Sequence, residues 1–162
     1  LGCKLNFTET ATLMRKFAEK GYDKVSDKEN PEIVVVNTCS VTHQADRKSR
    51  QYIRKMRHQN PDAVIVVTGC YAQLQAEIIA EKEDVDYIFG SNEKMKIIEI
   101  SPVLERQEKP KVYTCPLHEI NTFFPAYSEA ERTRAFLKVQ DGCDYFCAYC
   151  TVPFARGRSR SG

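Results

Sequence analysis

The sequence predicts an α/β fold: an open parallel sheet with helices on both faces, of the flavodoxin-like or Rossmann-like kind. Two runs of β-branched residues carry this prediction, "EIVVVNTC" at 32–39 and "AVIVVTGC" at 63–70. Continuous apolar runs of this length are typical of strands that are buried on both faces, as in a parallel sheet. Each run is followed by sequence with helical periodicity, and alternating strands and helices indicate a parallel sheet covered by helices.

The remaining elements continue this alternation. Gly21 follows the first helical pattern at the place where a helix C-terminus is usually closed. Pro102 stops the last helix, because proline cannot continue one. We expect helices at 9–22, 45–59, 72–83 and 93–100, and a further strand at 85–90.

We expect three parts in the chain: a first domain at 1–100, a linker at 101–132 and the truncated start of a second domain at 133–162. The middle part carries prolines and mixed charges without a sustained period, which is typical of a linker or an irregular crossing segment. Order returns at 135–140, where "AFLKVQ" alternates as a strand would. Both ends of the sequence stop abruptly, so we interpret the chain as a fragment of a longer protein.

Composition indicates a globular protein that is not embedded in a membrane. The chain has 162 residues, a formal net charge of +2, 42% hydrophobic residues and 28% charged residues. No apolar run approaches the roughly 18–20 residues that a membrane-spanning helix needs. No signal peptide opens the chain. We therefore expect a cytoplasmic protein with reduced cysteines, which at short spacing are more often metal ligands or catalytic groups than disulfides.

Three of the seven cysteines are expected at one edge of the sheet. Cys39 and Cys70 each end a predicted strand, and we expect Cys3 to follow a strand in the same way. The carboxyl ends of parallel strands lie along one edge, where ligands bind, and neighbouring strands are about 4.8 Å apart. The N-termini of the helices that follow also favour an anionic centre there. We call these three residues the sheet-edge triad.

The sheet-edge triad has two simpler interpretations. A free cysteine is often only a small buried hydrophobic residue, but three at equivalent strand ends make that explanation weaker. Zinc is the other competitor, although a closed structural zinc site needs four ligands. Three thiolates that leave one position open are expected of an iron–sulfur cluster that binds something at its free iron.

A second group of cysteines, "CDYFCAYC", follows the strand expected at 135–140. Cys143, Cys147 and Cys150, here called the loop triad, lie close enough in sequence for one loop to present them to one cuboidal cluster. A redox ferredoxin would need a fourth cysteine nearby, and none follows. We therefore expect a small molecule at the uncovered iron. A zinc loop is the alternative, but zinc sites favour paired C-x₂-C units.

The spacing CxxxCxxC, with the aromatic Tyr149 before its last cysteine, resembles the signature of radical S-adenosylmethionine enzymes. The resemblance implies that the uncovered iron binds the amino and carboxylate groups of S-adenosylmethionine, with Tyr149 as a cofactor-binding residue. It also implies that an external electron donor reduces the cluster, and that S-adenosylmethionine is then cleaved to a 5′-deoxyadenosyl radical. The part from residue 133 would then begin a radical S-adenosylmethionine partial α/β barrel.

Wider motifs resemble the methylthiotransferases: "LGCKLN", "NTCSVT", "VVTGCYAQ" and the sequence from residue 134 to the end. This resemblance implies two four-iron four-sulfur clusters, an auxiliary one on the sheet-edge triad and a radical one on the loop triad. One S-adenosylmethionine would methylate sulfur on the auxiliary cluster, and a second would supply the radical that activates a C–H bond. No side chain is assigned a catalytic role.

The first two motifs look more like the MtaB branch of this family than the MiaB or RimO branches. That branch acts on the N6-threonylcarbamoyladenosine beside the tRNA anticodon, so the implied partner is a tRNA anticodon stem-loop. MiaB-like action on isopentenyladenosine and RimO-like action on a ribosomal protein remain alternatives. A non-catalytic zinc or RNA-binding module and a flavin binder are alternatives from other classes. Because most of the barrel is absent, we expect this chain alone to be inactive.

Other candidates stay open at this point. The basic segment "DRKSRQYIRKMRH" at 46–58 could contact phosphates, but at net charge +2 a solvated helix face is the better interpretation. The amides of Asn6 and Asn37 could bond to sulfur or form turns. Further candidates, each with an ordinary structural explanation, are His43, Cys115, His118, Arg156, Arg158 and Arg160.

Overall fold

The computed structural model describes residues 2–128 and 134–162, and it confirms the predicted α/β class. Four parallel strands lie in the order β1-β2-β3-β4. Thr38 at the end of β1 is opposite Gly69 at the end of β2, so these two strands finish side by side. The strands are β1 (Ile33–Thr38), β2 (Val64–Gly69), β3 (Tyr87–Phe89) and β4 (Lys111–Tyr113).

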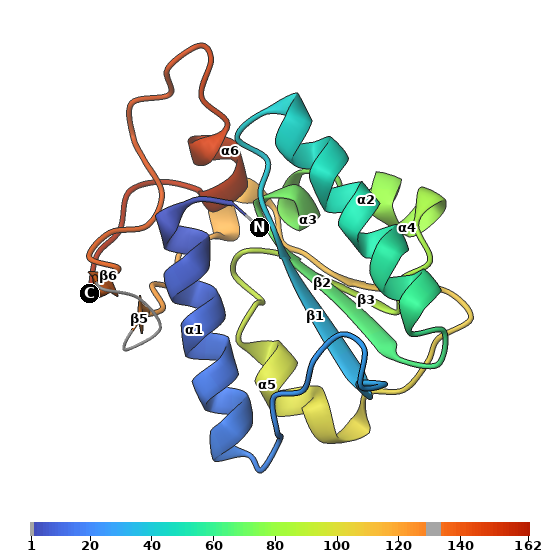
Figure 1. Ribbon diagram of the computed structural model, residues 1–162. Helices are drawn as coiled ribbons and strands as arrows, with labels where there is room; N and C mark the ends of the chain where they lie inside the picture. Colours follow the sequence, from blue (N-terminus) through green and yellow to red (C-terminus); the bar gives the residue numbers. More distant parts are fainter. Residues whose placement is uncertain (1, 129–133) are drawn as a thin grey trace.

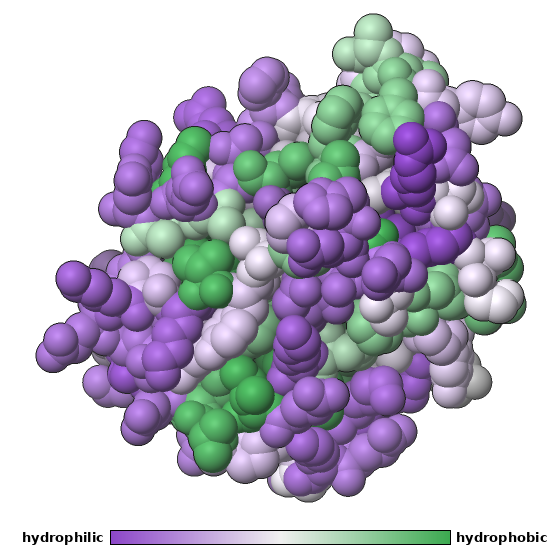
Figure 2. All heavy atoms as spheres, turned by 180° about the vertical axis from the view of Figure 1, so that it is seen from behind, coloured by the Kyte–Doolittle hydropathy of each residue, from purple (hydrophilic) through white to green (hydrophobic). Residues whose placement is uncertain are grey.

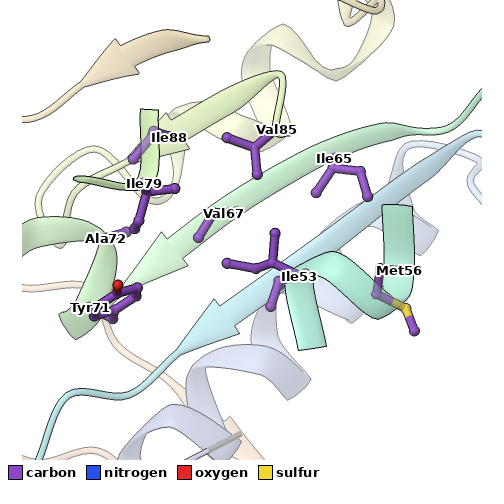
Figure 3. Close-up of a cluster of buried hydrophobic side chains, with 10 residues drawn as sticks. Ile53, Met56, Ile65, Val67, Tyr71, Ala72, Ile79, Val85 and Ile88 are labelled. Carbon is purple, nitrogen blue, oxygen red and sulfur yellow. The ribbon is translucent and has the colours of Figure 1, made fainter. Parts of the chain in front are cut away.

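Helices cover both faces of the sheet, as predicted (Figure 1). On one face, α2 (His43–Gln59), α3 (Cys70–Leu74) and α4 (Ala76–Lys82) pack on alternate residues of β1 and β2. The labelled side chains of Figure 3 show this core, in which Ile53 and Met56 of α2 meet Ile65 and Val67 of β2. On the other face, α1 (Lys4–Glu19) and α5 (Lys96–Ile100) cover Val64, Val66, Tyr87 and Phe89. Each strand of the pair therefore buries both of its faces.

The first helix ends as its sequence predicts. Gly21 has φ +85°, and its N–H donates to the carbonyl of Ala18 while the N–H of Tyr22 donates to Phe17. This pair of bonds is the Schellman arrangement, which satisfies carbonyls that the helix end leaves free. The rings of Phe17 and Tyr22 meet edge to face with their centroids 5.3 Å apart. The contact sets the direction in which the chain leaves α1.

Several elements differ from the predictions. The helix expected at 9–22 is α1, which begins five residues earlier, at Lys4, and ends at Glu19. The helix expected at 72–83 is two helices, because the backbone of Gln75 (φ −134°, ψ 32°) leaves the helical region between α3 and α4. The helix expected at 93–100 begins only at Lys96. The segment 101–132 supplies a fourth strand, β4, that the sequence patterns did not predict. Its sequence is only Lys-Val-Tyr, which is too short to show a strand period, and all three residues are exposed.

The C-terminal segment packs against α1 and α3. β5 (Tyr127–Ser128) and β6 (Phe136–Leu137) form a separate antiparallel pair beside α1, so the strand expected at 135–140 is only two residues long and does not join the parallel sheet. α6 (Val152–Arg156) lies next to α3, near the start of α1 (Figure 1). Two single-turn 3₁₀ helices, Ser101–Val103 and Leu117–Glu119, complete the described elements. Among the described residues, no helix has the length and apolar character needed to cross a membrane.

Candidate functional site

The carboxyl edge of the sheet places two predicted thiols next to one another. β1 ends at Thr38 and β2 ends at Gly69, and these two residues are paired, so Cys39 and Cys70 leave neighbouring strands at the same level. Both side chains are buried, with 5% and 6% exposure. The hydroxyl of Thr38 donates to the carbonyl of Thr68 at 2.6 Å, which links the carboxyl ends of the two strands. The strand-end positions predicted for these two cysteines are therefore confirmed.

Cys3 reaches the same edge by another route. Cys3 is the N-cap residue of α1, and the strand expected before it lies outside the described residues. Gly2 brings it close to β1: a Cβ on Gly2 would lie 2.7 Å from Cβ of Cys39 and 3.2 Å from its Sγ, and φ of Gly2 is +119°. Only glycine tolerates this combination of backbone angle and close approach. The backbone beside Cys3 thus lies against the side chain of Cys39.

One side chain connects Cys3 with Cys70. Arg156 of α6 donates from Nε to Sγ of Cys70 at 3.3 Å and from Nη2 to Oδ1 of Asn6 at 3.0 Å. The same Oδ1 accepts from Sγ of Cys3 at 3.5 Å. Asn6 also donates from Nδ2 to the carbonyl of Thr38, the residue before Cys39, at 2.7 Å. The amide of Asn6 therefore contacts sulfur, which was one of the two roles predicted for it.

The second predicted amide has a structural role instead. Asn37 donates from Nδ2 to the carbonyl of Asn6 at 3.1 Å and to the hydroxyl of Thr10 at 3.0 Å, which holds β1 against α1. Its Oδ1 is buried and accepts no hydrogen bond among the described residues. No contact of Asn37 with sulfur is present in the described part of the chain.

The donor set of this edge fits a cluster better than a single ion. In the described residues no three Cys, His, Asp or Glu side chains lie close enough to hold one metal ion. A cuboidal cluster has its irons at separate corners, so its thiolate ligands need not converge on a point. A hollow of about 220 Å³ lies between Gly2, Cys39 and the first residues of α2, with Lys48 in its wall. The sheet-edge triad thus offers soft donors, adjacent space and neighbouring positive charge.

The acidity of the Cys70 thiol reflects this environment. Burial raises its pKa, and the nearby Arg156 and Lys94 cations oppose that rise without cancelling it. A free thiol here is therefore held in its neutral form, while the groups around it are arranged for negative charge. Metal ligation deprotonates a coordinating thiol outright. The positive groups around Cys70 would then face a metal-bound thiolate, although the free thiol is neutral.

The loop triad lies in a different setting. Cys147 is exposed, and Cys143 and Cys150 are half-buried. The loop projects from the molecule at the top of Figure 1, and Figure 2 shows hydrophobic side chains gathered on this projection. Within it, Phe146 has φ +46° and its ring packs edge to face on Phe154 at 5.8 Å. Tyr149 is 90% exposed.

Among the hydrogen bonds that join the segment carrying the loop triad to the sheet edge, two reach Cys70 itself or the residue after Cys39. The hydroxyl of Thr151, the residue after Cys150, donates to the carbonyl of Ser40, the residue after Cys39, at 3.0 Å. The bond from Arg156 to Cys70 is the second. Residues more than 80 positions apart in sequence are thus brought together, so the segment that follows the loop triad adjoins the sheet edge.

A buried network of charged side chains lies under this junction, and the sequence analysis did not find it. Glu9 of α1 is paired with Lys94 at 2.5 Å, Lys138 at 3.2 Å and Arg156 at 2.8 Å. Asp141 accepts from Arg156 at 3.0 Å and pairs with Lys138 at 2.6 Å. All five side chains are at most 5% exposed. Their positions span 147 residues and follow no local pattern, so sequence periodicity carries no signal of them.

The basic segment at 46–58 forms most of α2, and its arginines mainly hold the domain together. Arg54 makes two bonds of 2.8 Å to the buried carboxylate of Glu83. Arg57 donates to Asp86 at 2.7 Å and to nearby carbonyls. Arg50 donates to the hydroxyl of Tyr71 at 3.0 Å, and this bond is the largest cause of its raised pKa. These contacts favour the structural interpretation of the segment over phosphate binding.

The remaining candidates lie apart from this junction or take no part in its bonds. Burial raises the pKa of Cys115 to about 11, helped by Glu93. His118 is exposed and pairs only weakly with the adjacent Glu119 at 3.7 Å. His43 is the first residue of α2 and is exposed. Cys115 and His118 belong to no metal-binding group of three among the described residues.

The chain is similar along nearly its whole length to proteins named as methylthiotransferases. The model of a family described as "Uncharacterized protein family UPF0004" matches residues 1–90. Over 99% of its length the chain is 41% identical to the threonylcarbamoyladenosine tRNA methylthiotransferase MtaB of Aquifex aeolicus, covering 40% of that protein. It is 30% identical to the tRNA-2-methylthio-N(6)-dimethylallyladenosine synthase of Thermodesulfovibrio yellowstonii, covering 99% of the chain and 37% of that protein.

A third relative, the ribosomal protein uS12 methylthiotransferase RimO of Synechococcus sp. CC9311, is 32% identical over 99% of the chain and 34% of its own length. The chain therefore spans two fifths or less of the length of these curated relatives. These matches confirm the resemblance that the cysteine motifs indicated.

Proposed function

Since the chain belongs to the UPF0004 family and is related along its length to methylthiotransferases, we propose that the protein containing it attaches a methylthio group to tRNA. The proposed target is C2 of N6-threonylcarbamoyladenosine beside the anticodon. The higher identity to the MtaB relative, 41% against 30% and 32%, supports this branch over the other two. The proposed chemistry depends on the two cysteine triads.

The observation that carries the proposal is the junction between the triads. Thr151 and Arg156, which follow the loop triad, bond to Ser40 and Cys70 at the sheet edge. A sulfur-inserting reaction needs the radical source and the sulfur source near one substrate carbon. The segment after the loop triad adjoins the sheet edge, as that requirement predicts, whereas two unrelated structural metal sites would not need to adjoin.

In this proposal each triad holds one four-iron four-sulfur cluster and leaves one iron free. The bound clusters and S-adenosylmethionine supply the radical and the sulfur chemistry. The chain's own contribution is placement: β1 and β2 fix Cys39 and Cys70, and the start of α1 brings Cys3 to them. Tyr149, exposed beside Cys150, is available to contact the bound S-adenosylmethionine.

An external electron donor and tRNA are the proposed partners, in the cytoplasm. The exposure of Cys147 and the projection of its loop leave a path for an electron donor. Arg54 and Arg57 of α2 are engaged in internal pairs, so they offer little to a phosphate. We therefore assign tRNA binding to parts of the protein beyond this chain.

Nucleoside analysis tests the proposal directly. In a strain that lacks the complete protein, mass spectrometry of hydrolysed tRNA is expected to show loss of the 2-methylthio form and accumulation of N6-threonylcarbamoyladenosine. The wild-type protein is expected to restore the modification, and a Cys39→Ala variant is expected not to. Loss of methylthio-isopentenyladenosine instead, or an unmodified uS12 with normal tRNA, would contradict the proposed substrate.

A further inference from the structure

The buried charge network beside Cys70 is not balanced by the side chains that form it. Its five most buried members carry three positive charges, on Lys94, Lys138 and Arg156, and two negative ones, on Glu9 and Asp141. Arg160, which is more exposed, adds a further cation at Asp141. All five are at most 5% exposed, and a buried charge without compensation is costly. Among these five buried side chains, one positive charge is therefore left for a further negative group.

The geometry shows where that negative group belongs. The guanidinium of Arg156 has five N–H donors, and each has an acceptor. Four of them go to Glu9, Asp141 and Asn6 at 2.8–3.0 Å. The fifth, on Nε, points at Sγ of Cys70 at 3.3 Å. The only one of these acceptors that can still gain a negative charge by ligating a metal is the Cys70 sulfur.

We propose that Arg156 is a positioning residue that couples the two triads, holding its fixed positive charge against the Cys70 sulfur while its own helix, α6, follows the loop triad. This inference rests on the proposed function, because it assumes a cluster at the sheet edge. The same guanidinium also orients Asn6, whose side chain contacts Cys3. Arg156 thus fixes the distance between the two sites and sets the electrostatic environment of one of them.

The physical consequence is a change in reduction potential. Reduction adds one electron to the cluster, so it adds one negative charge beside Cys70. A fixed cation that donates a hydrogen bond to a ligand sulfur stabilises this more negative state, since hydrogen bonds to sulfur and local charge set such potentials. Removing the guanidinium is expected to make the cluster harder to reduce.

A structural role alone makes a different prediction. Arg160 lies in the same segment, pairs with the same Asp141 at 3.4 Å, and donates to the carbonyls of Thr122 and Arg156, but it contacts no sulfur. If Arg156 only fastened the segment, neutralising either arginine would have the same kind of effect. Arg160 is therefore a matched control.

The test uses the complete protein with Cys143, Cys147 and Cys150 replaced by alanine, so that any iron bound is at the sheet edge. Arg156→Gln and Arg160→Gln are added separately, and each protein is reconstituted anaerobically and titrated with dithionite. We expect the Arg156→Gln midpoint potential to be more negative and its electron paramagnetic resonance signal to be altered. We expect Arg160→Gln to match the parent in both.

Each outcome decides one of the two proposals. Normal iron uptake with an unchanged potential in Arg156→Gln, or equal shifts in both variants, would overturn the coupling role of Arg156 and leave the proposed function standing. No iron uptake by the parent would overturn the proposed function, and this inference with it. Without Arg156 the most buried part of the network has two cations and two carboxylates, and Arg160 still pairs with Asp141, so the glutamine variant is expected to fold.

Arg156→Lys provides a second measure that does not depend on the glutamine variant. Lysine keeps the charge but has three donors instead of the planar five, so it cannot serve all the acceptors of Arg156. We expect a shift of the same sign and smaller size than with glutamine. A lysine variant indistinguishable from the parent in potential and spectrum would contradict the proposal.

Discussion

The two cysteine triads lie in opposite surroundings within one small structure. At the sheet edge, Cys39 and Cys70 are buried and follow strands whose backbones are paired along their whole length. In the projecting loop, Cys147 is exposed, and the neighbouring Tyr145 is 88% exposed. Cys39 and Cys70 are therefore positioned by the core, whereas Cys3 is exposed at the start of α1. The loop triad depends on contacts of its own segment, such as that of Phe146 with Phe154.

This difference shows how the two regions depend on each other. In the segment after the loop, α6 packs against α3, accepts a hydrogen bond from Ser91 at Ala155, and reaches the buried charge network through Arg156. Disturbing the network should therefore affect both regions, whereas disturbing the backbone of one region should affect that region first. Substitutions in the metal-free protein separate these cases.

The largest effect is expected from Glu9→Gln. The change leaves three buried cations with one carboxylate, and breaking a buried pair in this way costs about 3–5 kcal/mol. Urea unfolding measures the loss. Glu19→Gln, at the exposed end of the same helix, is the control and should change stability little. Equal effects of the two substitutions would show that the network does not stabilise the junction.

The Glu9 effect should also depend on pH. Burial alone would raise the pKa of Glu9, but Lys94, Arg156 and Lys138 hold it well below the ordinary value. The stabilisation is therefore complete above the ordinary carboxyl pKa of about 4.3 and is lost as the pH falls toward the lowered pKa. The stability difference between wild type and Glu9→Gln should shrink from pH 7 to pH 3, and a constant difference would contradict this account.

Next in size is a pair of glycine substitutions that compares the two regions directly. Gly69→Ala would place Cβ 2.3 Å from the carbonyl oxygen of Thr38, at φ +100°. Gly142→Ala would place Cβ 2.1 Å from the carbonyl oxygen of Arg158, at φ +72°. Strain of this kind costs on the order of 1–3 kcal/mol.

The two glycine variants should differ in where the strain is felt. We expect Gly69→Ala to lower the global unfolding free energy, because β2 is in the core. We expect Gly142→Ala to speed hydrogen exchange mainly in residues 141–160, with a smaller global change. If both variants lowered the global unfolding free energy equally, the loop region would contribute as much to global stability as the sheet edge.

A smaller effect is expected at the start of α2, which follows Cys39. The hydroxyl of Thr42 accepts a hydrogen bond from the N–H of Ala45 at 3.1 Å and so caps the helix. Thr42→Ala should cost about 1 kcal/mol, and Thr42→Ser should retain most of the stability. Thermal unfolding of the three proteins tests this, and an alanine variant as stable as wild type would argue against a capping role.

The smallest effect is expected at Cys115, which belongs to neither triad. Because its pKa is raised to about 11, little of it is thiolate near neutral pH. Iodoacetamide should modify it slowly at pH 8 and faster as the pH approaches 11, as followed by peptide mass spectrometry. Cys115→Ser should leave iron uptake unchanged, and a drop in bound iron would make Cys115 a ligand.

The sequence predicted the parts of this fold that have local signals. Runs of β-branched residues located β1, β2 and the cysteines that follow them, and Gly21 located the end of α1. β4 was missed because its three residues are too few to show a strand period. The position of Cys3 at the start of α1 depends on a close approach of Gly2 to Cys39 that no short motif reports.

The charge network was missed for a different reason. Glu9 lies on the buried side of α1 together with Asn6 and Thr12, and these polar residues do not mark a face as buried. Its partners come from segments 85 to 147 residues away, so only the tertiary structure brings them together. Arg156 could be singled out in the sequence as a candidate, but its contact with Cys70 could not be predicted.

Iron and sulfide analysis of the anaerobically reconstituted complete protein tests the central claim most directly. With a four-iron cluster on each triad, the wild type should bind roughly eight irons, and alanine replacement of either triad should leave roughly four. Zinc in place of iron, or a replacement of the sheet-edge triad that leaves the iron content unchanged, would contradict the account.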